Sequence, residues 1–141
     1  MMVAVKDRVR FVETDLMGVV HHSNYLRWFE MARVEYLRTA NVLLPDLIAD
    51  GILFPITEVQ CKYRQSAYFD EMIRVEATLV DFSRAKLCFA YRVVRETDNV
   101  LLAEGTTQNV FTDEKGRVIR LPQLYFERIE AVRQAENGGV A

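Results

Sequence analysis

The chain has 141 residues, of which half are hydrophobic and 27% are charged, a composition typical of one soluble globular domain. The net charge of −2 excludes the basic excess that non-specific binding of nucleic acid requires. No apolar run approaches the roughly 20 residues that span a bilayer, and Lys6, Asp7 and Arg8 stand where a signal peptide needs its apolar core. We therefore expect one cytoplasmic domain over residues 1–141, with no membrane span and no nucleic-acid partner.

The apolar residues follow a strand pattern, then a helical pattern, then strand patterns again. Tyr25, Phe29 and Ala32 recur at spacings of four and three, which predicts a long helix with a wide apolar face. Residues 71–82 and 85–96 alternate between apolar and polar side chains, as half-buried strands do. The expected elements are a strand over 3–12, a loop over 14–22, a helix over 23–40, a connector with one helical turn over 41–51, strands over 54–65, 71–82, 85–96 and 100–112, and a helix over 123–135.

The later strands are separated by short turns, which indicate antiparallel pairing. Residues 97–99 and 113–116 have the composition of hairpin turns. We expect an α+β fold in which one buried helix packs on an antiparallel sheet and the last four strands form a meander. The tail over 137–141 is expected to be frayed. Cys61 and Cys88 lie within alternating runs and are expected to be reduced strand residues.

Asp15 carries the strongest chemical signal in the chain. It lies in a glycine-containing loop just ahead of the expected helix start at Ser23, which would cap that helix. A helix start offers free N–H groups and the positive end of the helix dipole. A carboxylate beside them suits chemistry on a polarised carbonyl, as a nucleophile or a base. The alternative is a turn-forming aspartate that caps nearby N–H groups, and the residue pattern leaves both open.

Other polar residues of this region carry weaker signals. His21 and His22 are adjacent without a third ligand at a suitable spacing, so no metal site is expected. Ser23 lacks the surroundings of a nucleophilic serine, whereas the N–H groups near His22 are candidate oxyanion donors. Glu30 and Arg33 are expected to form a surface ion pair.

Two neighbouring motifs carry a family resemblance: Glu13-Thr-Asp15-x-x-Gly18-Val-Val-x-His22-x-x-Tyr25 and Phe29-Glu30-x-Ala32-Arg33-x-Glu35. They resemble the hotdog-fold acyl-CoA thioesterases, in particular the 4-hydroxybenzoyl-CoA thioesterase branch and its Tol–Pal-associated members. The resemblance covers roughly residues 5–122. It implies a hotdog fold, an antiparallel sheet wrapped around a long central helix, and assembly into a homodimer or homotetramer. It also implies hydrolysis of an acyl-CoA thioester without a cofactor or metal.

The resemblance assigns roles to matched positions. Asp15 matches the catalytic carboxylate, which is a nucleophile or a general base according to the member. His22 matches the position whose backbone N–H polarises the thioester carbonyl, and Tyr25 matches a tyrosine near the site. The expected substrate contacts are Gly18, Val19 and Ser23 around the loop, and Ser83, Arg84 and Lys86 in a turn where relatives meet the CoA phosphates.

The expected function is therefore hydrolysis of an acyl-CoA, with acyl carrier protein as an alternative carrier of the acyl group. Leu16 and Met17 replace smaller residues of many relatives, so the resemblance does not identify the acyl group of the substrate. One alternative is an aromatic acyl-CoA hydrolase, such as a 1,4-dihydroxy-2-naphthoyl-CoA thioesterase. Another is a hotdog protein that binds acyl-CoA or acyl carrier protein without turnover. A hydratase using His22 and Asp15 fits the motif less well.

Overall fold

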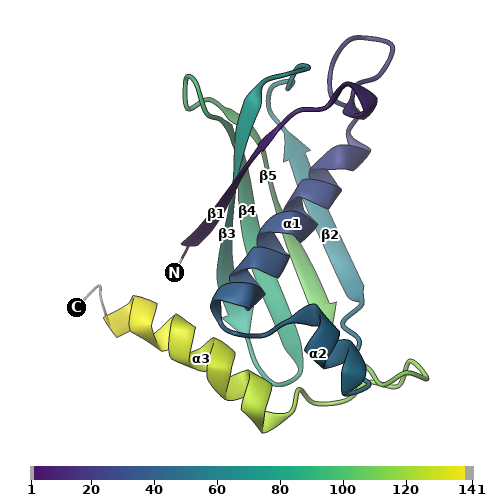
Figure 1. Ribbon diagram of the computed structural model, residues 1–141, viewed down its shortest axis with the longest axis vertical. Coiled ribbons are helices and arrows are strands. Elements are labelled where there is room, and N and C mark those ends of the chain that lie inside the picture. The colour runs from purple at the N-terminus through teal and green to yellow at the C-terminus, as the bar shows by residue number, and fades with distance from the viewer. Residues whose placement is uncertain (1, 139–141) are drawn as a thin grey trace.

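A computed structural model describes residues 2–138 as one curved antiparallel sheet with a long helix against its inner face (Figure 1). The α+β hotdog architecture is thus confirmed. Among the described residues, no helix is long and apolar enough to cross a membrane. The elements are β1 (Met2–Arg8), a 3₁₀ turn (Phe11–Glu13), α1 (Ser23–Thr39), α2 (Leu44–Ala49), β2 (Ile56–Tyr63), β3 (Met72–Phe82), β4 (Lys86–Arg95), β5 (Leu101–Val110) and α3 (Gln123–Gly138).

The strand order is β1-β3-β4-β5-β2, which confirms the meander for β3, β4 and β5 but not for β2. β2 lies beyond β5, with Val59 opposite Thr107. A short turn forces the two strands that it joins to pair with each other. β2 and β3 are joined instead by the longer segment 64–71, which crosses the end of the sheet, so these two strands need not pair. As a result β2 is an edge strand, and all its residues except Cys61 are exposed.

Two predicted boundaries need correction. The first strand ends at Arg8 rather than at residue 12, because local bonds turn the chain away from the sheet there. The Asp70 N–H donates to the Val9 carbonyl (3.0 Å), and the Arg10 N–H donates to Glu13 Oε1 (2.7 Å). The last helix continues to Gly138, beyond the predicted end, and the final part of the predicted frayed tail lies outside the described residues.

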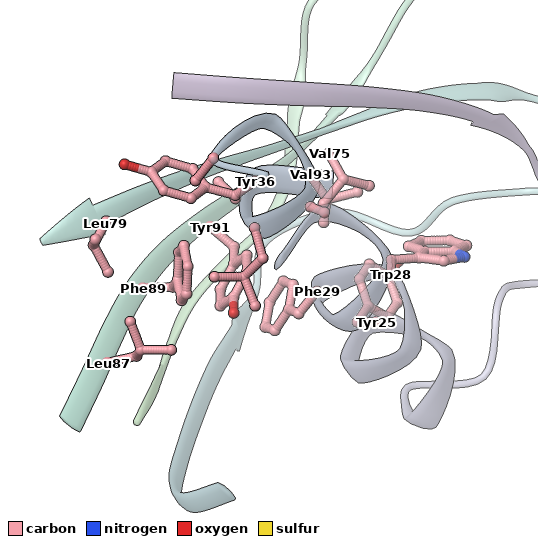
Figure 2. Packing of buried hydrophobic residues seen from close by; sticks show 14 of the residues in the cluster. Tyr25, Trp28, Phe29, Tyr36, Val75, Leu79, Leu87, Phe89, Tyr91 and Val93 are labelled. Carbon is pink, nitrogen blue, oxygen red and sulfur yellow. The ribbon is translucent and has the colours of Figure 1, made fainter. Parts of the chain in front are cut away.

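The core forms where the apolar face of α1 meets the alternating inward residues of β3 and β4 (Figure 2). The Phe29 ring stacks on Tyr91 with centroids 4.4 Å apart and planes 6° from parallel. This close approach of helix and sheet depends on Gly105 of β5, where a Cβ atom would lie 2.8 Å from the Phe29 ring. The helix start is therefore fixed relative to the sheet by buried aromatic packing.

Arg33 of α1 is buried and lacks a counter-ion. It is 5% exposed, and no carboxylate of the described residues lies within 4 Å of it, so the predicted surface pair with Glu30 is wrong. The reason is its position four residues after Phe29, which directs it towards the sheet. Its Nη1 donates to the Tyr91 hydroxyl at 3.1 Å.

Candidate active site

The loop that carries Asp15 is a narrow hairpin closed by backbone bonds. His21 N–H donates to the Glu13 carbonyl (2.8 Å), and Asp15 N–H donates to the Val19 carbonyl (2.9 Å). Gly18 has a φ of 79°, in the left-handed region that glycine adopts without strain. The second arm of the hairpin leads directly into α1, so the loop places the half-buried Asp15 close to the helix start.

The Asp15 side chain makes one local contact. Its Oδ1 accepts the Met17 N–H at 2.8 Å, which is the turn-capping geometry that the sequence left open. Asp15 also lines a cavity with His21, Ser23 and Asn24. A carboxylate that is oriented by one backbone donor and still faces a cavity remains available to a ligand there.

The helix start differs in detail from the prediction. His22, rather than Ser23, is the residue flanking α1, and the Ser23 N–H is directed to the His21 ring at 3.2 Å from Nδ1. The predicted capping by Ser23 is therefore wrong, because Ser23 is already the first residue of the helix and its hydroxyl lies against the His21 ring, 2.9 Å from Nδ1. Within residues 2–138, the His22 N–H has no hydrogen-bond partner. It is thus the backbone donor that stays free at this end of the helix.

Tyr25 lies beneath the helix start rather than in the Asp15 cavity. It is 3% exposed and packs edge-on against Trp28 and Tyr63, with centroids 4.9 and 5.1 Å away. Burial raises the pKa of Tyr25, so its hydroxyl stays protonated at neutral pH. The Tyr63 hydroxyl donates to the His22 carbonyl at 3.1 Å, which ties the helix start to β2. Tyr25 therefore packs the start of α1 against β2 and does not line the Asp15 cavity.

Glu13 is a buried residue beside the candidate site that the sequence analysis did not assign to the site. Its carboxylate is 4% exposed, and it accepts the Arg10 N–H through Oε1 (2.7 Å) and the Trp28 indole N–H through Oε2 (3.1 Å). Its carbonyl also accepts the Asn24 side-chain amide at 2.9 Å. Glu13 therefore joins both sides of the loop to α1. Only its place in the family motif marked it, because its main partner lies fifteen residues away.

The residues predicted to line the loop fall close together. Val19 pairs with Tyr68 as an isolated bridge, and the Val20 N–H donates to the Ala67 carbonyl at 2.9 Å, so this arm rests on the segment that follows β2. The Gly18 N–H donates to the Asp15 carbonyl at 3.0 Å, and the Val19 carbonyl accepts the Asp15 N–H. Ser23 lines the Asp15 cavity, whereas His22, its neighbour in the chain, is not among the residues that line it. The structure brings this part of the predicted site together.

The turn with Ser83, Arg84 and Lys86 lies at the opposite end of the sheet. β3 begins beside the end of β1, near the Asp15 loop, and spans about 33 Å at the usual rise per residue before the turn begins (Figure 1). Arg84 Nε donates to the Leu121 carbonyl (2.9 Å), and Lys86 pairs with Asp81 (3.2 Å). One chain therefore does not bring this turn to its own Asp15.

Large apolar side chains around the Asp15 loop are left uncovered. Leu16 and Met17 at the loop tip are strongly exposed, as are Phe11 and Val12 on the other side of the cavity. Phe11 contacts the exposed Phe69 edge-on, with centroids 5.6 Å apart. No group of three His, Cys, Asp or Glu side chains that could hold a metal occurs in the described part of the chain.

The sequence profile of the thioesterase-like superfamily matches residues 9–135, so the chain belongs to that superfamily. It is 34% identical to the acyl-CoA thioesterase YbgC of Haemophilus influenzae over 107 residues, covering 75% of this chain and 77% of that protein. The crystal structure of a DHNA-CoA thioesterase from Staphylococcus aureus superposes with a TM-score of 0.91 at 28% identity, covering 98% of this chain and 95% of the other. A hypothetical protein from Thermus thermophilus, TT1821, superposes with a TM-score of 0.86 at 37% identity, covering 93% and 97%.

Proposed function

We propose that this protein hydrolyses acyl-CoA thioesters. The observation that carries the proposal is the half-buried Asp15 carboxylate, held in a tight loop beside a helix start whose His22 N–H is free. The similarity to an acyl-CoA thioesterase across three quarters of the chain supports the same activity. Within the superfamily, the loop motif favours the 4-hydroxybenzoyl-CoA thioesterase branch and its Tol–Pal-associated type.

The chemistry follows from the two groups. The thioester oxygen accepts the His22 N–H, where the helix dipole stabilises the negative charge that develops on it, and one such donor is worth about 3 kcal/mol in the transition state. Asp15 either attacks the carbonyl carbon, which gives a mixed anhydride that water hydrolyses after the thiolate has left, or removes a proton from a water that attacks directly. The C–S bond then breaks, and its electron pair leaves on sulfur as a thiolate. A thiolate leaves without prior protonation, so Asp15 needs no acid partner.

Substitution of Asp15 by Asn tests this role. The amide neither attacks nor accepts a proton, so kcat with acyl-CoA should fall at least about a hundredfold while the fold is kept. The measurement is thiol release with an acyl-CoA panel. Asp70→Asn is the matched control, because Asp70 is exposed at the same end of the molecule and should leave kcat unchanged. Full activity in Asp15→Asn would refute the proposal.

We also propose that two copies complete each site by pairing their β2 edges. An exposed edge strand is a ready pairing surface, and antiparallel pairing about a two-fold axis places the far end of one sheet beside the near end of the other. Ser83, Arg84 and Lys86 of one copy would then lie at the same end as the other copy's Asp15, where they could meet the CoA phosphates.

An aromatic acyl-CoA is the second candidate substrate, favoured by the near-complete superposition on the DHNA-CoA thioesterase. The same panel separates it from aliphatic acyl-CoA by kcat/KM. Binding of acyl-CoA without thiol release would instead support the non-catalytic alternative. Acyl carrier protein as the carrier is tested by comparing one acyl group on CoA and on that protein.

A further inference from the structure

Two side chains of the Asp15 cavity form a pair that the proposed reaction does not use. His21 and Ser23 both line this cavity, and both are exposed. The Ser23 hydroxyl lies 2.9 Å from His21 Nδ1. At this distance an imidazole can act as the base that activates a hydroxyl nucleophile. The sequence did not predict the pair, because Ser23 stands outside the known motifs of nucleophilic serines.

A second hydrogen bond shows which member of the pair is the donor. The backbone N–H of Ser23 donates to the same His21 Nδ1, at 3.2 Å. Because a backbone N–H can only donate, Nδ1 accepts, and the neutral ring carries its hydrogen on Nε2. The Ser23 hydroxyl must then also donate to Nδ1. Its proton is therefore directed at a base, and within residues 2–138 no donor occupies the lone pairs of Oγ.

The His21 imidazole is held in place from two sides. The backbone N–H of His21 donates to the Glu13 carbonyl at 2.8 Å. The ring packs on the His22 ring, with centroids 4.2 Å apart and planes 31° from parallel. The His22 ring packs edge-on against Tyr63 of β2, at 6.3 Å between centroids. The base is thus oriented before a substrate binds, as efficient proton transfer requires.

The surroundings of Ser23 favour the negative charge that its attack on a carbonyl would create. Ser23 is the first residue of α1, so its hydroxyl lies at the positive end of the helix dipole. The free N–H of His22, the proposed oxyanion donor, belongs to the residue between His21 and Ser23. The cavity has a volume of about 570 Å³, within the range of small-molecule sites.

We propose that Ser23 is a nucleophile that takes the acyl group of the thioester, with His21 as its base. Ser23 Oγ forms a bond to the carbonyl carbon while its proton passes to His21 Nδ1. The C–S bond breaks, its electron pair leaves on sulfur, and the imidazolium releases the proton to solvent. Asp15 then takes a proton from the water that cleaves the ester on Ser23 and returns it to Oγ. This inference rests on the proposed hydrolysis of acyl-CoA and makes Asp15 the base of its second half.

The first test needs no thioester. Diisopropyl fluorophosphate forms a P–O bond with an activated serine and releases fluoride, and peptide mass spectrometry locates the adduct. The chain has three serines, Ser23, Ser66 and Ser83, and the adduct should form on Ser23 alone. His21→Phe keeps a ring against His22 but cannot take the proton, so labelling should slow at least about a hundredfold. Ser66→Ala, at an exposed serine, is the matched control and should be labelled as fast as the wild type.

The second test detects the acyl ester itself. Asp15→Asn protein mixed with an acyl-CoA should release about one thiol per chain in a burst and then nearly stop, because the ester forms but is not cleaved. Peptide mass spectrometry should find the acyl group on Ser23. The double variant Asp15→Asn/Ser23→Ala should show neither the burst nor the ester.

The location of the adduct in the wild-type protein decides the matter even if a variant fails to fold. Absence of an adduct on Ser23, or a Ser23→Ala protein that hydrolyses acyl-CoA at the wild-type rate, would overturn the inference and leave the hydrolase proposal intact. Labelling of Ser23 that depends on His21, in a protein that releases no thiol from any acyl-CoA, would support the nucleophile and refute the activity.

Discussion

At the scale of single residues, the proposed catalytic carboxylate of Asp15 depends on a second, buried carboxylate, Glu13, which joins the loop to α1. Asp15 and His22 were recognisable because a carboxylate before a helix start has a local signature. Glu13 has none, since its partners Arg10 and Trp28 become neighbours only when the loop closes on α1. Arg33 was misassigned for a similar reason, because charged spacing on a helix does not reveal which face is covered.

Glu13→Gln tests the role of the buried carboxylate. An amide oxygen can accept one of the two N–H groups, but its NH₂ then faces the other donor, so the free energy of unfolding should fall by about 2 kcal/mol. Urea unfolding gives this value. Glu35→Gln is the control, because Glu35 forms an exposed pair with Arg38 and its loss should cost no more than about 0.5 kcal/mol. Equal effects of the two changes would mean that Glu13 does not hold the loop.

At the scale of elements, periodicity predicted the helix and the four later strands to within about two residues, because each buries one face. It did not predict that β2 pairs with β5, since pairing of distant strands depends on how the segment 64–71 crosses the sheet. Nor did it explain Gly105. Gly105 lies within an ordinary strand pattern, and a side chain is excluded there only by its neighbours in space, the Gln60 carbonyl oxygen and the Phe29 ring.

Gly105→Ala should therefore destabilise the sheet. The added Cβ would lie 2.3 Å from the Gln60 carbonyl oxygen and 2.8 Å from the Phe29 ring, so β2 or α1 must move. Overpacking of this kind costs about 2 kcal/mol, which thermal and urea unfolding would report. Thr106→Ala, at the exposed neighbouring position, should stay within about 0.5 kcal/mol of the wild type. A Gly105→Ala protein as stable as this control would contradict the packing account.

At the scale of the whole molecule, the proposed site needs two ends of the sheet that one chain keeps apart. Removal of Arg84 and Lys86 by alanine should raise KM for an acyl-CoA about tenfold or more, because hydrogen bonds to charged groups are lost. KM for the same acyl group on N-acetylcysteamine, which has no phosphates, should stay unchanged. A similar rise in both KM values would show that the turn does not meet the phosphates.

Mixing the Asp15 variant with the turn variant shows whether the turn of one copy serves the carboxylate of the other. Suppose that the turn of each copy serves the Asp15 of the other copy. A hybrid of one Asp15→Asn chain and one Arg84→Ala/Lys86→Ala chain then has one site with both defects and one site with neither. Refolding the two together should then restore activity at low acyl-CoA concentration. Absence of recovery in hybrids of proven composition would place the turn and carboxylate of each site in one chain.

Because β3 separates the carboxylate loop from the basic turn, the activity would also depend on the concentration of the protein. A single chain would carry the carboxylate loop and the basic turn at opposite ends, where they cannot act on one substrate. The rate of hydrolysis would therefore depend on the fraction of chains that are paired. Dilution would switch the enzyme off without unfolding it, and at low expression the rate would climb more steeply than the amount of protein made.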